Sequence, residues 1–263
     1  MYTIPTLFQF KRHLGIPESN TAQDDRLLAT LEAASRHVER YTGRRFLPYR
    51  ATITHDLLPV CPNELLLTED LLQLISVTDA DGPIDTDDIT LLPADGPASL
   101  LRINGLFAWD SPERTADVTG VWGWNETPLD MWQDTGDAVN DLSLSSAATT
   151  ITVGDADAVY ADGVTPRFAV GALLNIEDEF VRVLSVDAVA NTLSVERGAQ
   201  GTTAIAHSLG TPIQVYRPAF DALITVLRVA AWLYRAPDTS PDNTIPPEVA
   251  HLLAGLRRVG VRA

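Results

Sequence analysis

The stretch LLATLEAASRHVERYTGRRF, Leu27 to Phe46, is the strongest fold signal in this chain, because it predicts one long amphipathic helix with a defined end. Apolar side chains recur at helical spacing on one face, and charged side chains occupy the other. Asp24 and Asp25 precede the stretch, where the helix dipole favours negative charge. Gly43 is placed to end the helix in the left-handed conformation. The apolar face consists of Leu27, Leu28, Leu31, Ala34, Val38 and Tyr41.

Further helices are predicted at both ends of the chain. TLFQFKRHLG indicates a helix over residues 6–15, and the long helix itself is predicted over 23–43. A wide apolar stripe predicts a helix over 219–235, and Pro247 suits the first turn of a last helix over 247–259. Neither pair has enough apolar surface to be stable alone, so we expect the N- and C-terminal helices to pack together.

Two β-rich regions lie between the helices. Residues 49–124 contain alternating or apolar segments such as ATITHDL, LLQLISVTDADG and ADVTGVWGW, and the acidic, turn-rich stretch over 81–97 is expected to be a surface loop. Residues 135–216 predict a small β-sandwich or barrel of about six strands. The predicted class is α+β: a discontinuous helical core built from 1–134 and 217–263, with an inserted β domain over 135–216.

The charge is unevenly distributed. The net charge is −16, and residues 51–216 carry five Lys/Arg against twenty-six Asp/Glu, whereas both ends are mildly basic. An acidic surface repels nucleic-acid phosphate, which argues against a DNA-binding module but suits a conduit to which DNA must not adhere. The single lysine among nineteen basic residues fits a GC-rich genome, and a salt-loving host would explain the excess of aspartate as well. Cys61 is the only cysteine, which excludes an internal disulfide.

No catalytic, metal-binding or cofactor-binding set is predicted. The five histidines are scattered without the spacing of a metal site, and His37, on or near the polar face of its helix, is expected to be solvated. The aspartates of two turn-rich tracts lack the glycine and closing glutamate of a calcium loop, so turns are favoured. These residues are His13, His37, His55, His207 and His251, with Asp85, Asp87, Asp88, Asp155, Asp157 and Asp162.

Three other clusters were weighed against ordinary structural roles. Glu177, Asp178 and Glu179 could supply paired carboxylates for glycoside hydrolysis, although acids in a strand-to-strand turn are much commoner. RGAQGT, residues 197–202, is glycine-rich but lacks the lysine of a phosphate loop, which favours a β-turn. Trp122, Trp124 and Trp132 could stack on a sugar or a base, but packing of strand ends against the core is favoured.

The pieces described above resemble the head–tail connector (adaptor) proteins of long-tailed bacteriophages. The long helix ending in Tyr41, Thr42, Gly43 and Arg44 is similar to that family's first long helix. TLFQFKRHLGI, LISVTDADG with ADVTGVWGW, and AFDALITVLRVAAWLYRAP with IPPEVAHLLAGLRRVGV match its other parts in order. The resemblance covers about 1–130 and 217–263. Residues 135–216 are absent from short members of the family and more loosely resemble a β module of other phage structural proteins.

The resemblance implies a virion structural protein rather than an enzyme. It implies a ring, commonly of twelve copies, that docks beneath the portal, passes genome DNA without specific binding and receives a stopper or tail completion protein. Assembly in the host cytoplasm, a place at the head–tail interface and no membrane association are expected, and the inserted β domain could contact the capsid. The closing segment is the expected portal-docking region, through Leu252, Leu253, Leu256, Arg257, Arg258 and Arg262.

Two other classes of function stay open from the sequence. One is a host-surface or carbohydrate-binding virion protein that binds through the inserted β domain. The other is a hydrolase that uses the acids at 177–179.

Overall fold

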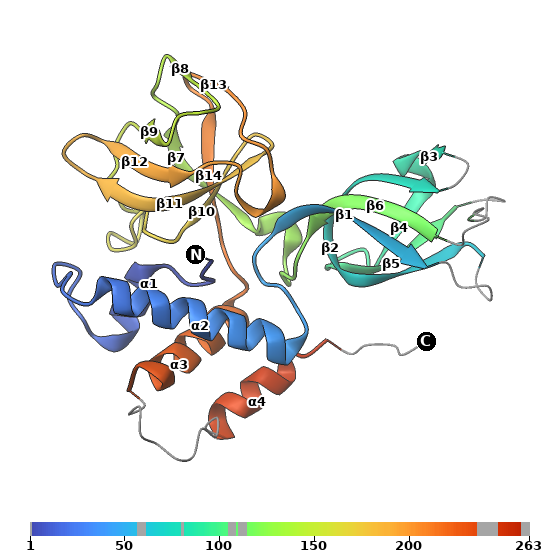
Figure 1. Cartoon of the computed structure of the whole chain (residues 1–263), viewed down its shortest axis with the longest axis horizontal. Helices are drawn as coiled ribbons and strands as arrows, with labels where there is room; N and C mark the ends of the chain where they lie inside the picture. The colour runs from blue at the N-terminus through green and yellow to red at the C-terminus, as the bar shows by residue number, and fades with distance from the viewer. Residues whose placement is uncertain are drawn as a thin grey trace. The chain divides into compact units, whose positions relative to one another are not determined.

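The computed structural model describes residues 2–56, 62–79, 82–104, 109, 115–235 and 247–258 (Figure 1). The chain forms two compact units, one of residues 1–43 with 131–263 and one of residues 44–130. Helices stand at both ends of the chain and strands fill the middle, which confirms the predicted α+β class. No helix of the described residues is long and apolar enough to span a membrane.

Four helices form the helical part of the first unit. α2 is the central helix, because it packs against α1, α3 and α4. Thr6 caps α1 through a capping box with Gln9, and Gly15 and Gly43 end α1 and α2 with positive φ angles of 71° and 66°. The observed bounds lie within the predicted ranges: α1 Leu7–Leu14, α2 Asp24–Thr42, α3 Phe220–Arg235 and α4 Pro247–Gly255.

The second unit contains one antiparallel sheet in the order β1-β6-β2-β5-β4, with β3 paired to β2. Gly120 permits the close approach of β6 and β2, because a Cβ there would lie 2.6 Å from the carbonyl oxygen of Gln73. The strands are β1 Tyr49–Asp56, β2 Glu64–Asp79, β3 Gly82–Ile84, β4 Ile89–Leu92, β5 Ala98–Ile103 and β6 Thr115–Trp122.

The prediction of a surface loop over 81–97 was wrong in part. This stretch contains β3, the short 3₁₀ helix η1 Thr86–Asp88 and all of β4. Ile89 is buried, and Leu91 packs against the same core. The two apolar residues alternate with outward positions, and pairing with β5 outweighs the turn-forming residues around them.

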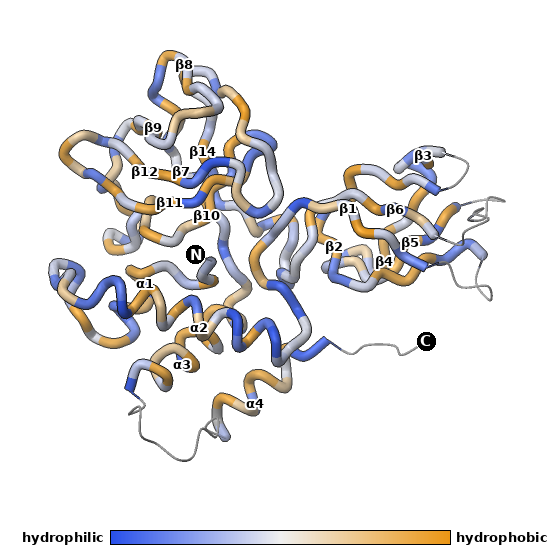
Figure 2. Tube along the Cα trace, viewed as in Figure 1, coloured by the Kyte–Doolittle hydropathy of each residue, from blue (hydrophilic) through white to orange (hydrophobic). Residues whose placement is uncertain are grey.

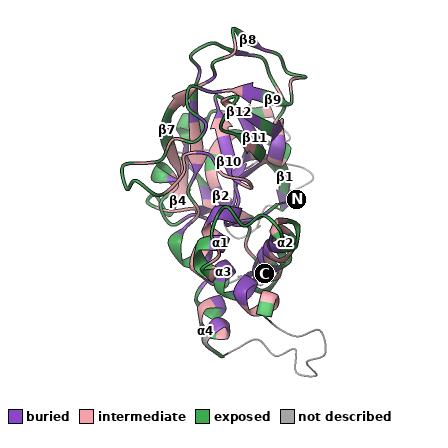
Figure 3. Cartoon of the chain, turned by 90° about the vertical axis from the view of Figure 1, so that its left-hand side faces the viewer, coloured by how far each residue is buried: buried purple, intermediate pink, exposed green. Residues whose placement is uncertain are grey.

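The second sheet belongs to the same compact unit as the helices and has the order β7-β14-β10-β11-β12-β9. Strands β8 and β13 form a separate pair. Alternate apolar residues of the second sheet's strands contribute to a core of their own. Figures 2 and 3 colour the same strands by hydropathy and by burial. The strands are β7 Trp132–Ala138, β8 Ser143–Leu144, β9 Thr150–Thr152, β10 Leu173–Ile176, β11 Glu179–Asp187, β12 Thr192–Glu196, β13 His207–Ser208 and β14 Pro212–Tyr216.

The first and last strands of the second sheet lie next to each other: the chain enters the sheet after residues 44–130 and leaves it toward α3. These strands, β7 and β14, are antiparallel neighbours, and Trp132 pairs with Tyr216. The backbone N–H of Arg217 donates to the carbonyl oxygen of Met131 at 2.8 Å. The ends of this segment therefore lie side by side, as they do in domains inserted into a loop.

Candidate functional site

The end of α2 is built by residues that the sequence singled out. The hydroxyl of Thr42 donates to the carbonyl oxygen of Val38 at 2.8 Å, and Thr42 is buried. Gly43 then takes the left-handed conformation, and its N–H donates to the carbonyl of Glu39 at 2.9 Å. Tyr41 is 44% exposed. The glycine stops the helix and redirects the chain, and the tyrosine remains accessible.

Arg44 begins the unit of residues 44–130 and is tied into it. Its guanidinium forms an ion pair with Asp70 at 2.9 Å and lies 5.1 Å from the centre of the Trp124 ring. The backbone N–H of Gly123 donates to the carbonyl oxygen of Asp70 at 2.8 Å, and Phe46 packs edge-on against Trp124. The motif Tyr41–Arg44 therefore has two halves: the first ends a helix and the second anchors the sheet unit.

The structure brings the helix-end motif and the closing segment together. The backbone N–H of Arg258 donates to the carbonyl oxygen of Thr42 at 2.8 Å. This oxygen is one of the last carbonyls of α2, which have no partner inside the helix. The closing segment thus satisfies a helix-end acceptor, a contact that sequence spacing alone does not reveal.

The side chains of the closing segment divide into buried and accessible ones. Leu253 and Leu256 are buried, and α4 contacts both α2 and α3. Leu252 is half-buried, Arg257 is exposed and Arg258 is half-buried. Arg262 lies outside the described residues. Leu253 and Leu256 hold α4 to the chain's own helices, and docking of this segment to a portal stays a prediction.

The acids considered for hydrolysis form a buried ionic network instead of an open pair. Glu179 is 0% exposed and accepts two hydrogen bonds from the Arg197 guanidinium, at 2.7 and 2.8 Å. The backbone N–H groups of Gly198 and Ile205 also donate to it, at 2.8 and 3.0 Å. Burial opposes its ionisation, but these hydrogen bonds together with one to His207 outweigh burial and lower the pKa of Glu179 to about 2.

His207 extends this network to the surface turn. Its Nε2 lies 2.9 Å from a carboxylate oxygen of Glu179, and its Nδ1 lies 2.8 Å from one of Glu177. Glu177 and Asp178 are exposed in the turn between β10 and β11. Both carboxylate oxygens of Glu179 accept hydrogen bonds. The network therefore holds together Arg197, the turn that follows Arg197, and β13. No local pattern predicts this network, because its members are separated by up to 30 positions.

The other candidate residues from the sequence take part in ordinary packing and hydrogen bonding. Trp122 is buried, stacks on His55 and donates through Nε1 to the carbonyl of Ala51. Trp132 packs against Phe180 and Tyr216. Asp162 accepts hydrogen bonds from the Thr165 hydroxyl and from two backbone N–H groups of its own turn, which lower its pKa to about 2. Within the described ranges, no group of three or more His, Cys, Asp or Glu side chains is arranged to hold a metal ion.

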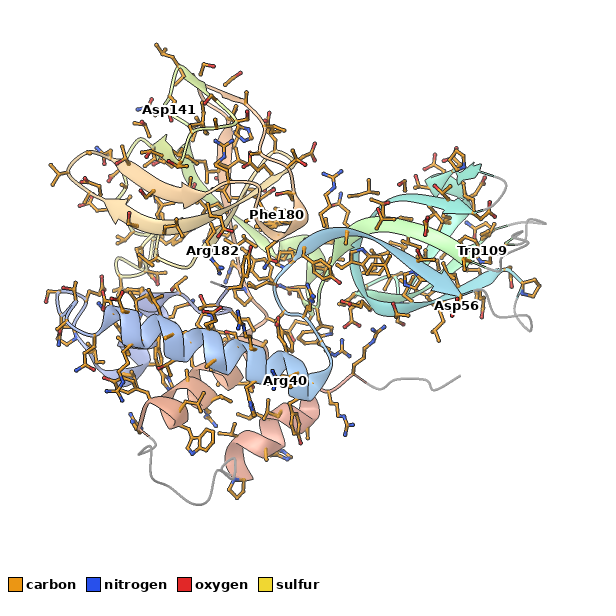
Figure 4. The ribbon with its side chains drawn as sticks, in the orientation of Figure 1. Arg40, Asp56, Trp109, Asp141, Phe180 and Arg182 are labelled. Carbon is orange, nitrogen blue, oxygen red and sulfur yellow. The ribbon has the colours of Figure 1, made fainter. Side chains whose placement is uncertain are left out.

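A buried arginine is a feature that the sequence analysis missed. Arg182, on β11, is 2% exposed, and its guanidinium lies 4.5 Å from the centre of the Tyr2 ring (Figure 4). Neither Nη atom has a hydrogen-bond partner, and burial lowers the pKa of the guanidinium. The hydroxyl of Tyr2 donates to Glu196 at 3.2 Å. The N-terminal segment is thereby held against the second sheet, and the N–H of Leu7 donates to the carbonyl of Val170 at 3.0 Å.

Comparison with known families identifies the N-terminal part of the chain. No curated protein matches the chain. Residues 4–76 match the model of the phage gp6-like head-tail connector proteins. The match contains α1, α2, the motif Tyr41–Arg44, β1 and most of β2. This agrees with the resemblance noted from the sequence: over residues 4–76 the chain is similar to phage head–tail connector proteins.

Proposed function

We propose that the protein forms a ring beneath the portal, through which the genome passes and to which a stopper or tail completion protein attaches. The observation that carries this proposal is the family match over residues 4–76, a range that includes α2 and its end motif. The helices of the C-terminal part complete the same helical core, because α3 and α4 both contact α2.

The closing segment is proposed to dock the ring to the portal. The bond from Arg258 to Thr42 ties this segment to the end motif of α2, and Arg257 is exposed beside it. Guanidinium groups suit bidentate contacts with carboxylates. In this proposal Leu253 and Leu256 fix the position of α4, whereas Leu252, Arg257, Arg258 and Arg262 supply the contacts with the portal.

The charge distribution supports passage of DNA without specific binding. Residues 44–130 carry five Lys/Arg against fifteen Asp/Glu. Such a surface repels phosphate, and a repelled duplex slides past without being retained. The inserted domain over 135–216 is proposed to be an appendage of the ring that contacts the capsid, since the chain enters and leaves it through paired strands.

Imaging of particles tests the proposed function. In a map of the assembled virus, this chain should form a symmetric ring between the portal and the tail. Particles assembled with the chain truncated after Thr244 should lack the ring and lose DNA from their heads. The variant Arg36→Glu is the matched control, because it reverses an exposed charge on α2 far along the chain from the closing segment. A map that places the chain only on the capsid surface or at the tail tip would contradict the proposal.

A further inference from the structure

A hollow between the first two helices and the end of α3 has an arginine in its lining. It has a volume of about 320 Å³ and is lined by Leu14, Ile16, Asn20, Gln23, Leu27, Tyr234 and Arg235. Leucine, isoleucine and tyrosine form its apolar wall, while Arg235 and two amides supply polar groups. Arg26 lies over the Tyr234 ring at 4.9 Å, so a second guanidinium stands nearby.

Two exposed arginines, Arg228 and Arg235, lie close enough to His13 to disfavour its protonated form. His13 on α1 has a pKa lowered by burial and then by the charges of Arg235 and Arg228. Arg228 and Arg235 are exposed, and among the described residues neither takes part in an ion pair. We define the basic pocket as this hollow together with Arg228 and Arg235. Two neighbouring guanidinium groups that form no ion pair among the described residues favour an anionic partner.

An exposed turn elsewhere in the chain carries negative charge, opposite to that of the basic pocket. Asp85, Asp87 and Asp88 lie at the start and within η1, and all three are exposed. Asp85 accepts a hydrogen bond from the N–H of Asp87 at 3.0 Å, which fixes the shape of the turn. No described cation pairs with these carboxylates. We define the acidic turn as Asp85–Asp88.

We propose that the basic pocket receives the acidic turn of a second copy of this chain, so that the two surfaces form the contact between neighbouring subunits. The inference rests on the proposed ring and names its interface. Two different surfaces of one chain that complement each other make a head-to-tail contact, and repetition of such a contact closes a ring. The carboxylates of Asp87 and Asp88 lie against Arg228 and Arg235 in this contact.

Charge complementarity selects a protein partner over nucleic acid. The unit that carries the acidic turn has a threefold excess of acids over bases. A duplex bound at the pocket would bring its phosphates close to a chain of net charge −16. The apolar wall of the hollow also suits a compact turn better than a charged sugar–phosphate backbone.

Charge reversal in two separate chains tests the contact. The basic-pocket variant Arg228→Glu/Arg235→Glu and the acidic-turn variant Asp87→Arg/Asp88→Arg each place like charges across the interface. Each alone should form about 100-fold less ring than wild type, as measured by native mass spectrometry with and without portal-bearing heads. An equimolar mixture should restore an even-numbered ring with alternating subunits, because each altered surface then meets its complement.

Matched controls separate this inference from the proposed function. Arg36→Glu/Arg40→Glu and Asp95→Arg/Glu126→Arg reverse the same number of exposed charges elsewhere and should assemble as wild type does. Circular dichroism of every variant establishes that it is folded. A wild-type chain that stays monomeric in both settings overturns the ring itself. A wild-type ring with variants that assemble equally well overturns only this contact.

Two further outcomes would assign the pocket to another occupant. If the basic-pocket variant alone fails to assemble, and the acidic-turn variant behaves as wild type, a different acidic segment fills the pocket. If the basic-pocket variant assembles normally but its particles retain less DNA, the pocket contacts nucleic acid. Either result contradicts the proposed pairing.

Discussion

The backbone N–H of Arg258 is hydrogen-bonded to the carbonyl oxygen of Thr42 at 2.8 Å, although the two residues belong to opposite ends of the chain. This bond joins the closing segment to the last turn of α2. The helical core is therefore closed by its most C-terminal described residues, and the side chains that hold α4 should contribute to the stability of the whole helical part.

Leu253→Ala should lower the free energy of unfolding by about 2–4 kcal/mol, because the wild-type side chain is 0% exposed and its loss leaves a cavity. Denaturant unfolding followed by circular dichroism measures the effect. Leu252→Ala is the matched control, since Leu252 is half-buried and should cost roughly 1 kcal/mol. Equal losses of unfolding free energy for Leu253→Ala and Leu252→Ala would contradict the packing of α4.

Gly43→Ala should destabilise the protein by about 1 kcal/mol, because alanine is strained at a φ of 66°. No atom crowds the position, so backbone conformation alone sets the cost. The same substitution at Gly255, which has no positive φ and no close neighbour, should be neutral or slightly stabilising. Thermal unfolding of the pair measures the difference, and a neutral Gly43→Ala would argue against a left-handed cap.

Glu179→Gln should destabilise the second sheet at neutral pH, by about 3 kcal/mol, because it leaves Arg197 buried beside a neutral group. The pKa of Glu179 is depressed to about 2, so its stabilising contribution is complete above its unfolded pKa of 4.5 and is lost as pH falls toward 2. The difference in stability between wild type and variant should therefore shrink across pH 4.5 to 2. The exposed Glu177→Gln serves as control, and a pH-independent difference would contradict the charged network.

Arg182→Met should leave the free energy of unfolding unchanged or raise it by about 1–4 kcal/mol, in contrast to most substitutions of buried residues. Two buried Nη atoms lack hydrogen-bond partners, so removing the charge relieves a desolvation cost, and methionine fills a similar volume. Chemical denaturation at neutral pH measures whether the substitution raises or lowers the free energy of unfolding. Arg197→Met, which removes a fully hydrogen-bonded guanidinium, should destabilise strongly, and a similar loss at Arg182 would show that its pairing is better than the geometry indicates.

Replacing residues 135–216 by a short Gly/Ser linker should leave a folded protein that keeps its helices and the sheet of residues 44–130. Trp132 and Tyr216 are paired neighbours, so a short linker spans the ends without strain. The deletion removes the acceptor of the Leu7 N–H, so some loss of stability at α1 is expected. Far-ultraviolet circular dichroism and gel filtration measure the outcome. An insoluble product, or one without helical signal, would assign the second sheet to the indispensable core.

Local patterns predicted the helices well, because each helix carries its own signals. The apolar face of α2 and the glycine at its end are encoded within twenty residues of sequence. The strand β4 was missed for the opposite reason: Ile89 and Leu91 are surrounded by turn-forming residues, and only pairing with β5 makes the segment a strand.

The long-range contacts could not be predicted from one sequence. The sequence predicts Glu179 as an acid of a strand-to-strand turn, because nothing near it indicates that Arg197 and His207 enclose it. Arg182 reads as an ordinary strand residue, and its burial depends on the placement of Tyr2. The joining of Arg258 to Thr42 likewise depends on how the helices pack.

The discontinuous helical core also sets the order of events during synthesis. α2 ends at Thr42 and its partner α3 begins at Phe220, so at ordinary translation rates roughly 10–40 s separate their emergence from the ribosome. Throughout that interval the apolar face of α2 has only α1 beside it. The two sheets can fold before α3 and α4 emerge, and the helical core is completed only after both of these helices have been made. Nascent chains stalled before residue 220 should therefore be the species most prone to chaperone capture.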